Sequence, residues 1–90
     1  MTLPTGTIRY WAGAREAAGV ATEPYTARTL AEALSAAIER HGGSAGPLAK
    51  VLDRCAFVVD GAPVSRKPPA EVPLRVDGTI EVLPPFAGGR

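Results

Sequence analysis

The residues best suited to chemistry lie at the end of the chain, and they offer backbone rather than side chains. The run Leu83-Pro84-Pro85-Phe86-Ala87-Gly88-Gly89 contains no nucleophile, general base or metal ligand. Pro84 and Pro85 remove two backbone donors and stiffen the chain, so the preceding strand ends there. Gly88 and Gly89 have no Cβ, so another protein's backbone or a nucleotide can come close to them. The pattern predicts a tail that carries a terminal carboxylate into a partner's active site.

The reach of this segment fits that function. An extended chain from Pro84 to Gly89 spans about 20 Å. The alternative is a frayed terminus, which is the default for any chain end. A Gly-Gly pair that follows a strand and two prolines favours the functional interpretation, with Phe86 as an apolar anchor.

Side chains elsewhere form no convincing catalytic set. His41 is the only histidine and follows a predicted helix, so capping of that helix is favoured over catalysis or metal binding. Cys55 precedes an apolar strand and has no basic partner to activate it, so we interpret it as a small core residue. The nine carboxylates are dispersed, and Gly42-Gly43 lacks the lysine of a phosphate-binding loop. We expect no metal site and no catalytic apparatus within the chain.

The composition narrows the class of protein. Ninety residues with 46% hydrophobic and 21% charged residues are typical of one soluble globular domain. The net charge is +1 and the basic residues are scattered, which argues against nucleic-acid or membrane partners. The N-terminus lacks the regions of a signal peptide, and one cysteine fits a reducing cytoplasm. We expect a cytoplasmic protein.

The first third of the chain predicts two strands around a short helix. Alternation over Thr7–Ala12 places Ile8, Tyr10 and Ala12 on one face of a strand, and Trp11 on the other. A large aromatic there needs cover from a helix, the tail or a partner. A helical turn follows and ends at Gly19. Residues 22–26 then predict a second strand, and the proline within it suits an edge position.

The main helix begins at Thr29, where Thr29 and Glu32 form a capping-box pattern. An apolar stripe predicts that one face lies in a core; its members are Leu30, Ala33, Leu34, Ala37 and Ile38. Arg40 and His41 suit the C-terminal end of the helix dipole, and Gly42-Gly43 ends the helix.

The second half predicts a short helix and three strands. The helix covers 47–52, a strand covered on both faces runs over 56–59, and Asp60-Gly61 makes a hairpin to a brief return strand with a proline on its edge. Residues 65–76 are proline-rich and irregular, and the final strand runs over 79–83.

These elements predict an α+β fold, a mixed sheet of four to five strands with one main helix across one face. Val58 and Val82 are expected at its centre, packed against the helix stripe. We expect one domain over residues 1–83 and a flexible tail over 84–90.

The sequence resembles the ubiquitin-like sulfur carriers of the MoaD/ThiS family, and above all the small subunit of molybdopterin synthase. Three segments resemble the opening, the main helix and the valine-rich strand of that subunit: Ile8–Glu16, Thr29–Leu34 and Ala56–Gly61. The segment Asp77–Gly89 resembles its ending almost position by position, and it is the specific part of the likeness.

The resemblance implies a β-grasp fold and a carrier rather than an enzyme acting alone. In such carriers an adenylating enzyme of the ubiquitin-activating type uses ATP to activate the terminal glycine, and a sulfur donor converts it to a thiocarboxylate. The large subunit of molybdopterin synthase then accepts the tail. By position, Gly89 is the activated residue, Gly88 is a spacer, and Pro85, Phe86 and Ala87 belong to the segment that contacts the partner.

Arg90 departs from the family pattern, which ends at the second glycine. We expect a peptidase to remove Arg90 before activation; the alternative is an inactive or regulated form. Two other functions stay open. One is the same chemistry for another pathway, such as thiazole, cysteine or secondary-metabolite synthesis. The other is a β-grasp interaction module without covalent chemistry.

Overall fold

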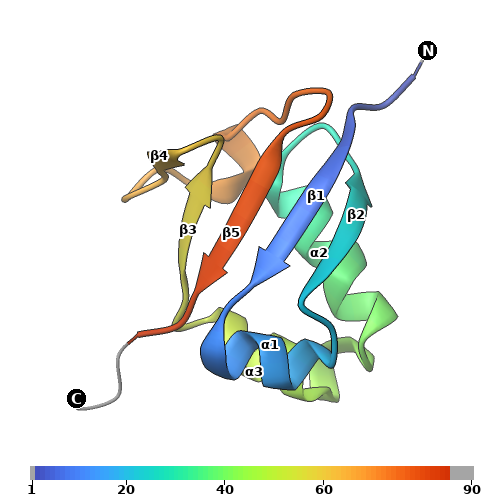
Figure 1. Cartoon of the computed structure of the whole chain (residues 1–90), viewed down its shortest axis with the longest axis vertical. Coiled ribbons are helices and arrows are strands. Elements are labelled where there is room, and N and C mark those ends of the chain that lie inside the picture. Colours follow the sequence, from blue (N-terminus) through green and yellow to red (C-terminus); the bar gives the residue numbers. More distant parts are fainter. Residues whose placement is uncertain (1, 86–90) are drawn as a thin grey trace.

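The computed structural model of the chain describes residues 2–85, whose strands form one five-stranded sheet. The strands are β1 (Thr5–Tyr10), β2 (Thr22–Thr26), β3 (Ala56–Val59), β4 (Ala62–Pro63) and β5 (Thr79–Leu83), and the helices are α1 (Ala12–Ala18), α2 (Leu30–Arg40) and α3 (Pro47–Leu52). The strand order is β2-β1-β5-β3-β4 (Figure 1). Only β1 and β5 are parallel, so the sheet is mixed as predicted.

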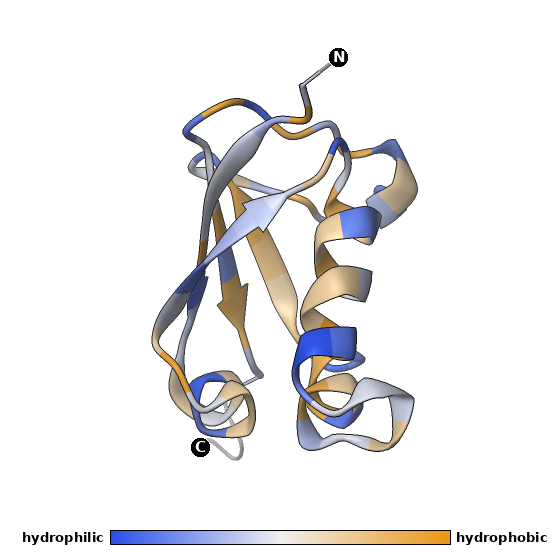
Figure 2. Cartoon of the chain, turned by 90° about the vertical axis from the view of Figure 1, so that its right-hand side faces the viewer, coloured by the Kyte–Doolittle hydropathy of each residue, from blue (hydrophilic) through white to orange (hydrophobic). Residues whose placement is uncertain are grey.

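Helix α2 lies across one face of the sheet, and the core fills the space between these two layers (Figure 2). Ile8, Ile80 and Val82 are fully buried on the sheet side, as is Leu30 on the helix side. The alternation of buried Ile80 and Val82 with half-buried neighbours places both on the helix-covered face. The α+β roll of the β-grasp type is confirmed.

The first strand ends earlier than the alternation predicts. β1 stops at Tyr10, and Trp11 is already the N-cap of α1, with its carbonyl accepting the N–H of Ala14 at 3.0 Å. Ala12 has a φ of 48° and an exposed side chain, so it does not share the core face of Ile8 and Tyr10. Helix α1 ends, as predicted, at Gly19 in the left-handed conformation.

The capping box at the start of α2 is half formed. Thr29 Oγ1 accepts the backbone N–H of Glu32 at 3.2 Å, but Glu32 Oε1 accepts from Arg28 N at 2.9 Å rather than from Thr29. The proline-rich segment packs against this helix start, since Leu30 N donates to Val72 O at 2.9 Å. It is therefore more ordered than predicted: a 3₁₀ turn covers Pro69–Glu71.

The prediction for the valine-rich strand was wrong about which side chain is central. β3 lies between β5 and the two-residue β4, and Val59 pairs with Ile80 on the core face. Val58 pairs with Glu81 and faces the open side of the sheet, where it is only half-buried. Because side chains alternate along a strand, β3 cannot be covered on both faces when only one face carries helices. Phe57 and Val59 take the place predicted for Val58.

Both edge strands carry a proline whose missing N–H would point away from the sheet. For β2, Tyr10 N donates to Ala21 O and Ala27 N donates to Pro4 O. In an antiparallel pair every second residue bonds to the partner strand, so in this register the ring nitrogen of Pro24 points away from β1. In β4, Val64 N donates to Phe57 O, so Pro63 lies at the outward position of its pair with β3. The predicted edge positions of both prolines are confirmed.

Candidate functional site at the root of the tail

The last strand brings the chain to one end of the sheet, beside the end of β1. Because β5 runs parallel to β1, Leu83 and Trp11 lie at the same end of the sheet. The hairpin between β3 and β4 lies at the other end (Figure 1). Pro84 is half-buried, and Pro85 is exposed where the chain leaves the sheet.

The remaining predicted site residues, Phe86, Ala87, Gly88 and Gly89, lie outside the described residues, as does Arg90. Their roles, and the division into a domain over 1–83 and a tail over 84–90, stay predictions.

Trp11 is the largest exposed side chain at the root of the tail, with 42% of its surface accessible. Its backbone N–H donates to Val82 O at 3.2 Å, and its indole Nε1 donates to Glu81 Oε1 at 3.2 Å. The guanidinium of Arg9 lies over the ring, 5.5 Å from its centroid. The indole is therefore held from two strands and stays partly exposed, although its size led us to expect cover from a helix, the tail or a partner.

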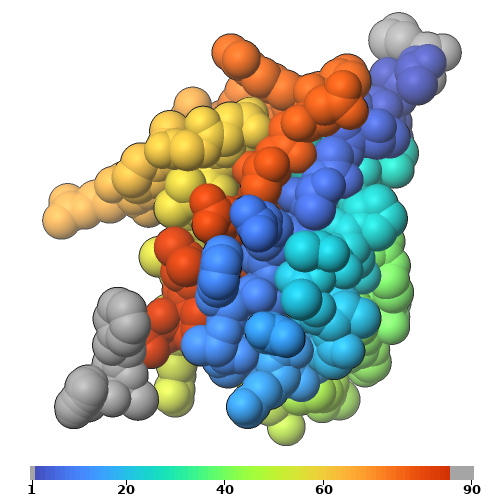
Figure 3. Space-filling view, viewed as in Figure 1, coloured from blue at the N-terminus to red at the C-terminus, as the bar shows by residue number. Residues whose placement is uncertain are grey.

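Around Trp11 the open face of the sheet carries several apolar side chains. Leu83 and Val58 are half-buried, and Ala56, which pairs with Leu83, is exposed. This face is the one seen in Figure 3, where β3, β5 and β1 lie at the surface. Apolar residues beside the exit of the tail are suited to contact with a protein that receives the tail.

His41 takes part in a polar network that the sequence analysis missed. His41 follows the last residue of α2, as expected, but its Nε2 lies 2.8 Å from Glu23 Oε2. Arg40 Nη1 lies 2.8 Å from Glu23 Oε1, and the Tyr10 hydroxyl donates to Glu23 Oε2 at 2.5 Å. The network joins β1, β2 and the end of α2. A buried tyrosine whose hydroxyl needs a partner was the one available signal.

The charge of Glu23 is favoured by this network. Only 9% of its side chain is accessible. Burial by itself raises the pKa of Glu23, but the hydrogen bonds from Tyr10, Arg40 and His41 outweigh it and bring the pKa below its ordinary value. Burial, and then the Glu23 carboxylate, raises the pKa of Tyr10. The groups hold one another in place, so the network is structural.

Cys55 has the environment of a structural residue. It is half-buried, and its thiol donates to Val51 O at 3.2 Å. Burial raises the pKa of the Cys55 thiol, which opposes thiolate formation. Cys55 is therefore a poor nucleophile, in line with its interpretation as a core residue.

Within residues 2–85 no three His, Cys, Asp or Glu side chains lie close enough together to hold a metal ion. In the same part of the chain, no helix is both long and apolar enough to cross a membrane.

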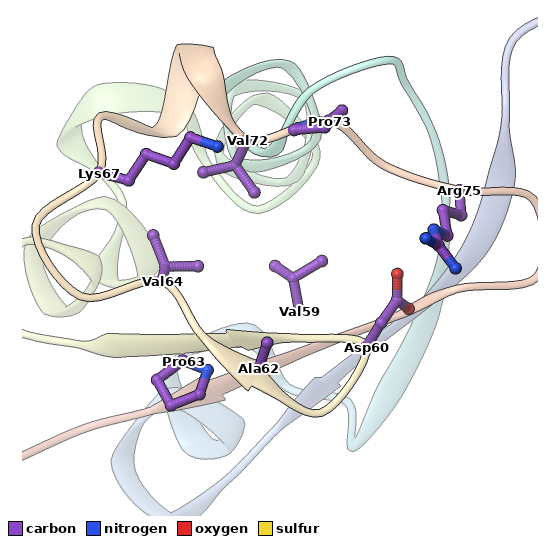
Figure 4. Close-up of a pocket in the computed structure, with 9 residues that line it drawn as sticks. All are labelled: Val59, Asp60, Ala62, Pro63, Val64, Lys67, Val72, Pro73 and Arg75. Carbon is purple, nitrogen blue, oxygen red and sulfur yellow. The ribbon is translucent and has the colours of Figure 1, made fainter.

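A cleft of about 360 Å³ lies between the β3–β4 hairpin and the proline-rich segment, away from the tail. Figure 4 shows Lys67 and Arg75 at its opposite ends, with Val59, Val64 and Val72 between them. The Asp60 carboxylate in its wall accepts the N–H of Thr79 at 2.8 Å and so stabilises the hairpin. The cleft holds no nucleophile paired with a base.

Several solved structures share this fold. The small archaeal modifier protein 1 of Methanosarcina acetivorans has a TM-score of 0.81 and 18% identity, covering 99% of this chain and 100% of that one. A putative molybdopterin converting factor subunit 1 of Pyrococcus furiosus has a TM-score of 0.71 and 21% identity, covering 91% and 98%. Subunits 1 and 2 of the molybdopterin-converting factor of Helicobacter pylori form a complex, and the matched chain there has a TM-score of 0.64 and 21% identity, covering 94% and 99%. These likenesses show the fold.

No match was found among curated proteins. The model of the ThiS family matches residues 8–89, which include the strand β5, both tail prolines and both tail glycines, and leaves Arg90 outside. The match covers most of the chain, and the chain therefore belongs to the ThiS family.

Proposed function

We propose that this protein is a sulfur carrier for molybdopterin synthesis and that its reactive group is the carboxylate of Gly89. The observation that carries the proposal is the place where the chain leaves the sheet, at Pro84 and Pro85. At this end of the sheet, beside the last residue of β5, Trp11 and Leu83 form an apolar contact surface. The match to the family model continues to Gly89. As a member of this family the chain acts with a partner rather than as an enzyme by itself.

The chemistry takes place on the partner. An adenylating enzyme of the ubiquitin-activating type binds ATP, and the Gly89 carboxylate attacks the α-phosphate, releasing pyrophosphate and forming an acyl-adenylate. A persulfide sulfur of a donor then attacks the acyl carbon and expels AMP. Reductive cleavage of the sulfur–sulfur bond by a thiol leaves the thiocarboxylate. The carrier itself binds no cofactor, and its glycines give the partner's groups access to the acyl carbon.

Activation at Gly89 requires cleavage of its peptide bond to Arg90, because Gly89 has a free carboxylate only when no residue follows it. A peptidase that cleaves the Gly89–Arg90 bond would supply the reactive form.

The acceptor we propose is the large subunit of molybdopterin synthase. The support is the shared fold of two molybdopterin-converting-factor small subunits, one of them in complex with its subunit 2. A second candidate is a protein modifier, in which a lysine amine of a target attacks the same activated glycine; the likeness to the archaeal modifier supports it. Carriers for thiazole, cysteine or secondary-metabolite synthesis use the same first steps.

The test is incubation of the chain, with and without Arg90, with ATP, the host's adenylating enzyme and a persulfide donor, followed by intact-mass spectrometry. We expect a mass increase equal to the replacement of one oxygen by sulfur, only on the form that ends in Gly89. The same increase on a chain that keeps Arg90 would show that trimming is unnecessary. Full function of a Gly89→Ala variant in the host would overturn the carrier proposal and favour a non-covalent interaction module. Isopeptide linkage to other proteins would favour the modifier.

A further inference from the structure

Two arginines flank the exposed indole at the root of the tail, and neither has a carboxylate partner in residues 2–85. Arg9, Trp11 and Arg15 line a small cavity of about 160 Å³ between the end of β1, the start of β2 and α1. Within the described residues, the ion pairs closer than 4.0 Å involve Arg40 and His41 with Glu23. We call Arg9, Trp11 and Arg15 the arginine–indole cluster.

We propose that the arginine–indole cluster binds a carboxylate side chain of the adenylating enzyme and sets the affinity of that complex. This inference rests on the proposed function, because it assigns the recognition chemistry of the protein that receives the tail.

The geometry of Arg9 suits a carboxylate ligand. Its guanidinium lies over the Trp11 ring at 5.5 Å from the centroid, within the range of a cation–π interaction. A guanidinium that packs on an aromatic ring with its flat face keeps its N–H edge for another ligand. That edge presents parallel donors that match the two oxygens of a carboxylate. The contact with Trp11 places Arg9 beside the indole, and its paired donors suit a bidentate contact there.

In the described part of the chain, no carboxylate near the cluster forms an ion pair with Arg9 or Arg15. Glu81 is opposite Arg9 in the sheet register, but its Oε1 accepts the indole N–H of Trp11 and it lies beyond 4.0 Å of the Arg9 guanidinium. Glu16 follows Arg15 directly in α1, and neighbouring residues of a helix do not face each other. Glu23 is held by Tyr10, Arg40 and His41. None of these three carboxylates is therefore an ion-pair partner of Arg9 or Arg15.

The position of the cluster ties it to the tail. Arg9 pairs in register with Glu81, which precedes Leu83 by two residues on β5. A protein that encloses the tail from its root therefore contacts the same end of the open face. A carboxylate on that protein would meet two guanidinium groups and an aromatic ring, a combination enriched at the energetically important centres of interfaces.

The direct test is the dissociation constant of the host's adenylating enzyme for the chain, measured by calorimetry with and without Arg90. We expect the Arg9→Glu/Arg15→Glu variant to bind at least about tenfold more weakly, because like charges would face each other across the interface. The matched control is Arg66→Glu/Lys67→Glu, which makes the same charge change on exposed residues of the proline-rich segment. We expect the control to bind as the wild type does.

Two further measurements separate geometry from charge. Arg9→Lys/Arg15→Lys keeps the charge but loses the forked donors, so its affinity should lie between those of the wild type and the glutamate variant. Raising the salt from about 50 to about 300 mM should weaken wild-type binding more than binding of the glutamate variant. Because Arg9 and Arg15 are exposed, thermal melting should show that all variants fold.

The inference is overturned if the two glutamate double variants lose affinity equally, or if the enzyme does not bind the wild type. It is also overturned if ATP without the enzyme quenches the fluorescence of Trp11, since the cluster would then be a nucleotide site. Binding that depends on the cluster without adenylation of Gly89 would instead overturn the proposed function while supporting the docking contact.

Discussion

Pro24 and Pro63 occupy equivalent positions on opposite edges of the sheet, each with its ring nitrogen where an outward N–H would otherwise lie. An open edge normally offers N–H and C=O groups to another strand, which leads to aggregation or to recognition by strand addition. A proline at the outward position removes one donor without breaking the sheet's own hydrogen bonds. This arrangement disfavours pairing at either edge and leaves the open face and the tail for partners.

Replacing both edge prolines should therefore promote self-association. A Pro24→Thr/Pro63→Thr variant restores an outward N–H on each edge and supplies a residue with high strand propensity. Sedimentation velocity across a concentration series should show a larger rise in average mass for this variant than for the wild type. Pro69→Thr, in the exposed 3₁₀ turn, is the control. Equal behaviour of the three proteins would mean that the prolines do not protect the edges.

The Glu23 network should make stability depend on pH in the acid range. The pKa of Glu23 is lower in the folded chain than in the unfolded chain, so the unfolded state takes up its proton first as the pH falls. The stabilisation is fully present above the ordinary glutamate pKa of about 4.3 and is lost as the pH falls through the folded-state value. Glu23→Gln should lower the free energy of unfolding by about 1–3 kcal/mol at neutral pH. In this variant the free energy of unfolding should also fall less steeply as the pH is lowered; we call this fall the acid limb.

Urea unfolding at neutral pH and near pH 4, about the ordinary glutamate pKa, measures both effects. Glu39→Gln is the matched control, because Glu39 is exposed on α2 and its side chain forms no described hydrogen bond or ion pair. An acid limb in Glu23→Gln as steep as that in the wild type would show that other carboxylates cause the acid loss of stability.

The sequence predicted local features well because their causes are local. The alternation of apolar residues predicted that Ile80 and Val82 face the core, and the glycine after α1 predicted the end of that helix. Asp60-Gly61 predicted the hairpin, where the two residues have φ values of 51° and 82°. The run Phe57-Val58-Val59 is apolar throughout, so no alternation of polar and apolar residues shows which side chains face the core. That face depends on pairing with β5, a contact distant in sequence.

The neighbouring valines of β3 provide a direct check of that face. Val59 is buried in the core, whereas Val58 lies half-buried on the open face. Val59→Ala should lower the free energy of unfolding by about 1–3 kcal/mol, in proportion to the apolar surface it buries, and Val58→Ala by less than about 1 kcal/mol. Guanidinium unfolding of the two variants gives the comparison. A larger loss for Val58→Ala would place the register of β3 one residue from that described.

For the candidate site, the sequence predicted the tail from its composition, but it did not predict how the tail's root is built. The hydrogen bond of Trp11 with Glu81 depends on the parallel pairing of β1 with β5, across about seventy residues of chain. The Glu23 network likewise joins Tyr10 on β1 to the end of α2. Such contacts follow from the assembled sheet, so a pattern within one segment cannot reveal them.

Gly6 shows another long-range requirement, because it lies opposite Tyr25 in the sheet and leaves room for that ring. A Cβ on Gly6 would lie 2.5 Å from the Tyr25 hydroxyl oxygen and would also collide with the carbonyl of Gly78. The ring cannot easily move, since Tyr25 is buried and its hydroxyl donates to Arg75 O at 2.7 Å. Gly6→Ala should therefore cost about 1–3 kcal/mol of stability through overpacking.

Gly13 provides the opposite case within the same chain. A Cβ at Gly13 would meet no atom within 4 Å, and the residue lies in α1, where alanine is favoured over glycine. Gly13→Ala should raise the free energy of unfolding by about 0.4–1 kcal/mol, mainly by restricting the unfolded chain. Thermal and urea unfolding of the two variants should shift in opposite directions. If Gly6→Ala were also stabilising, the close approach of Tyr25 to the backbone of β1 would have to be wrong.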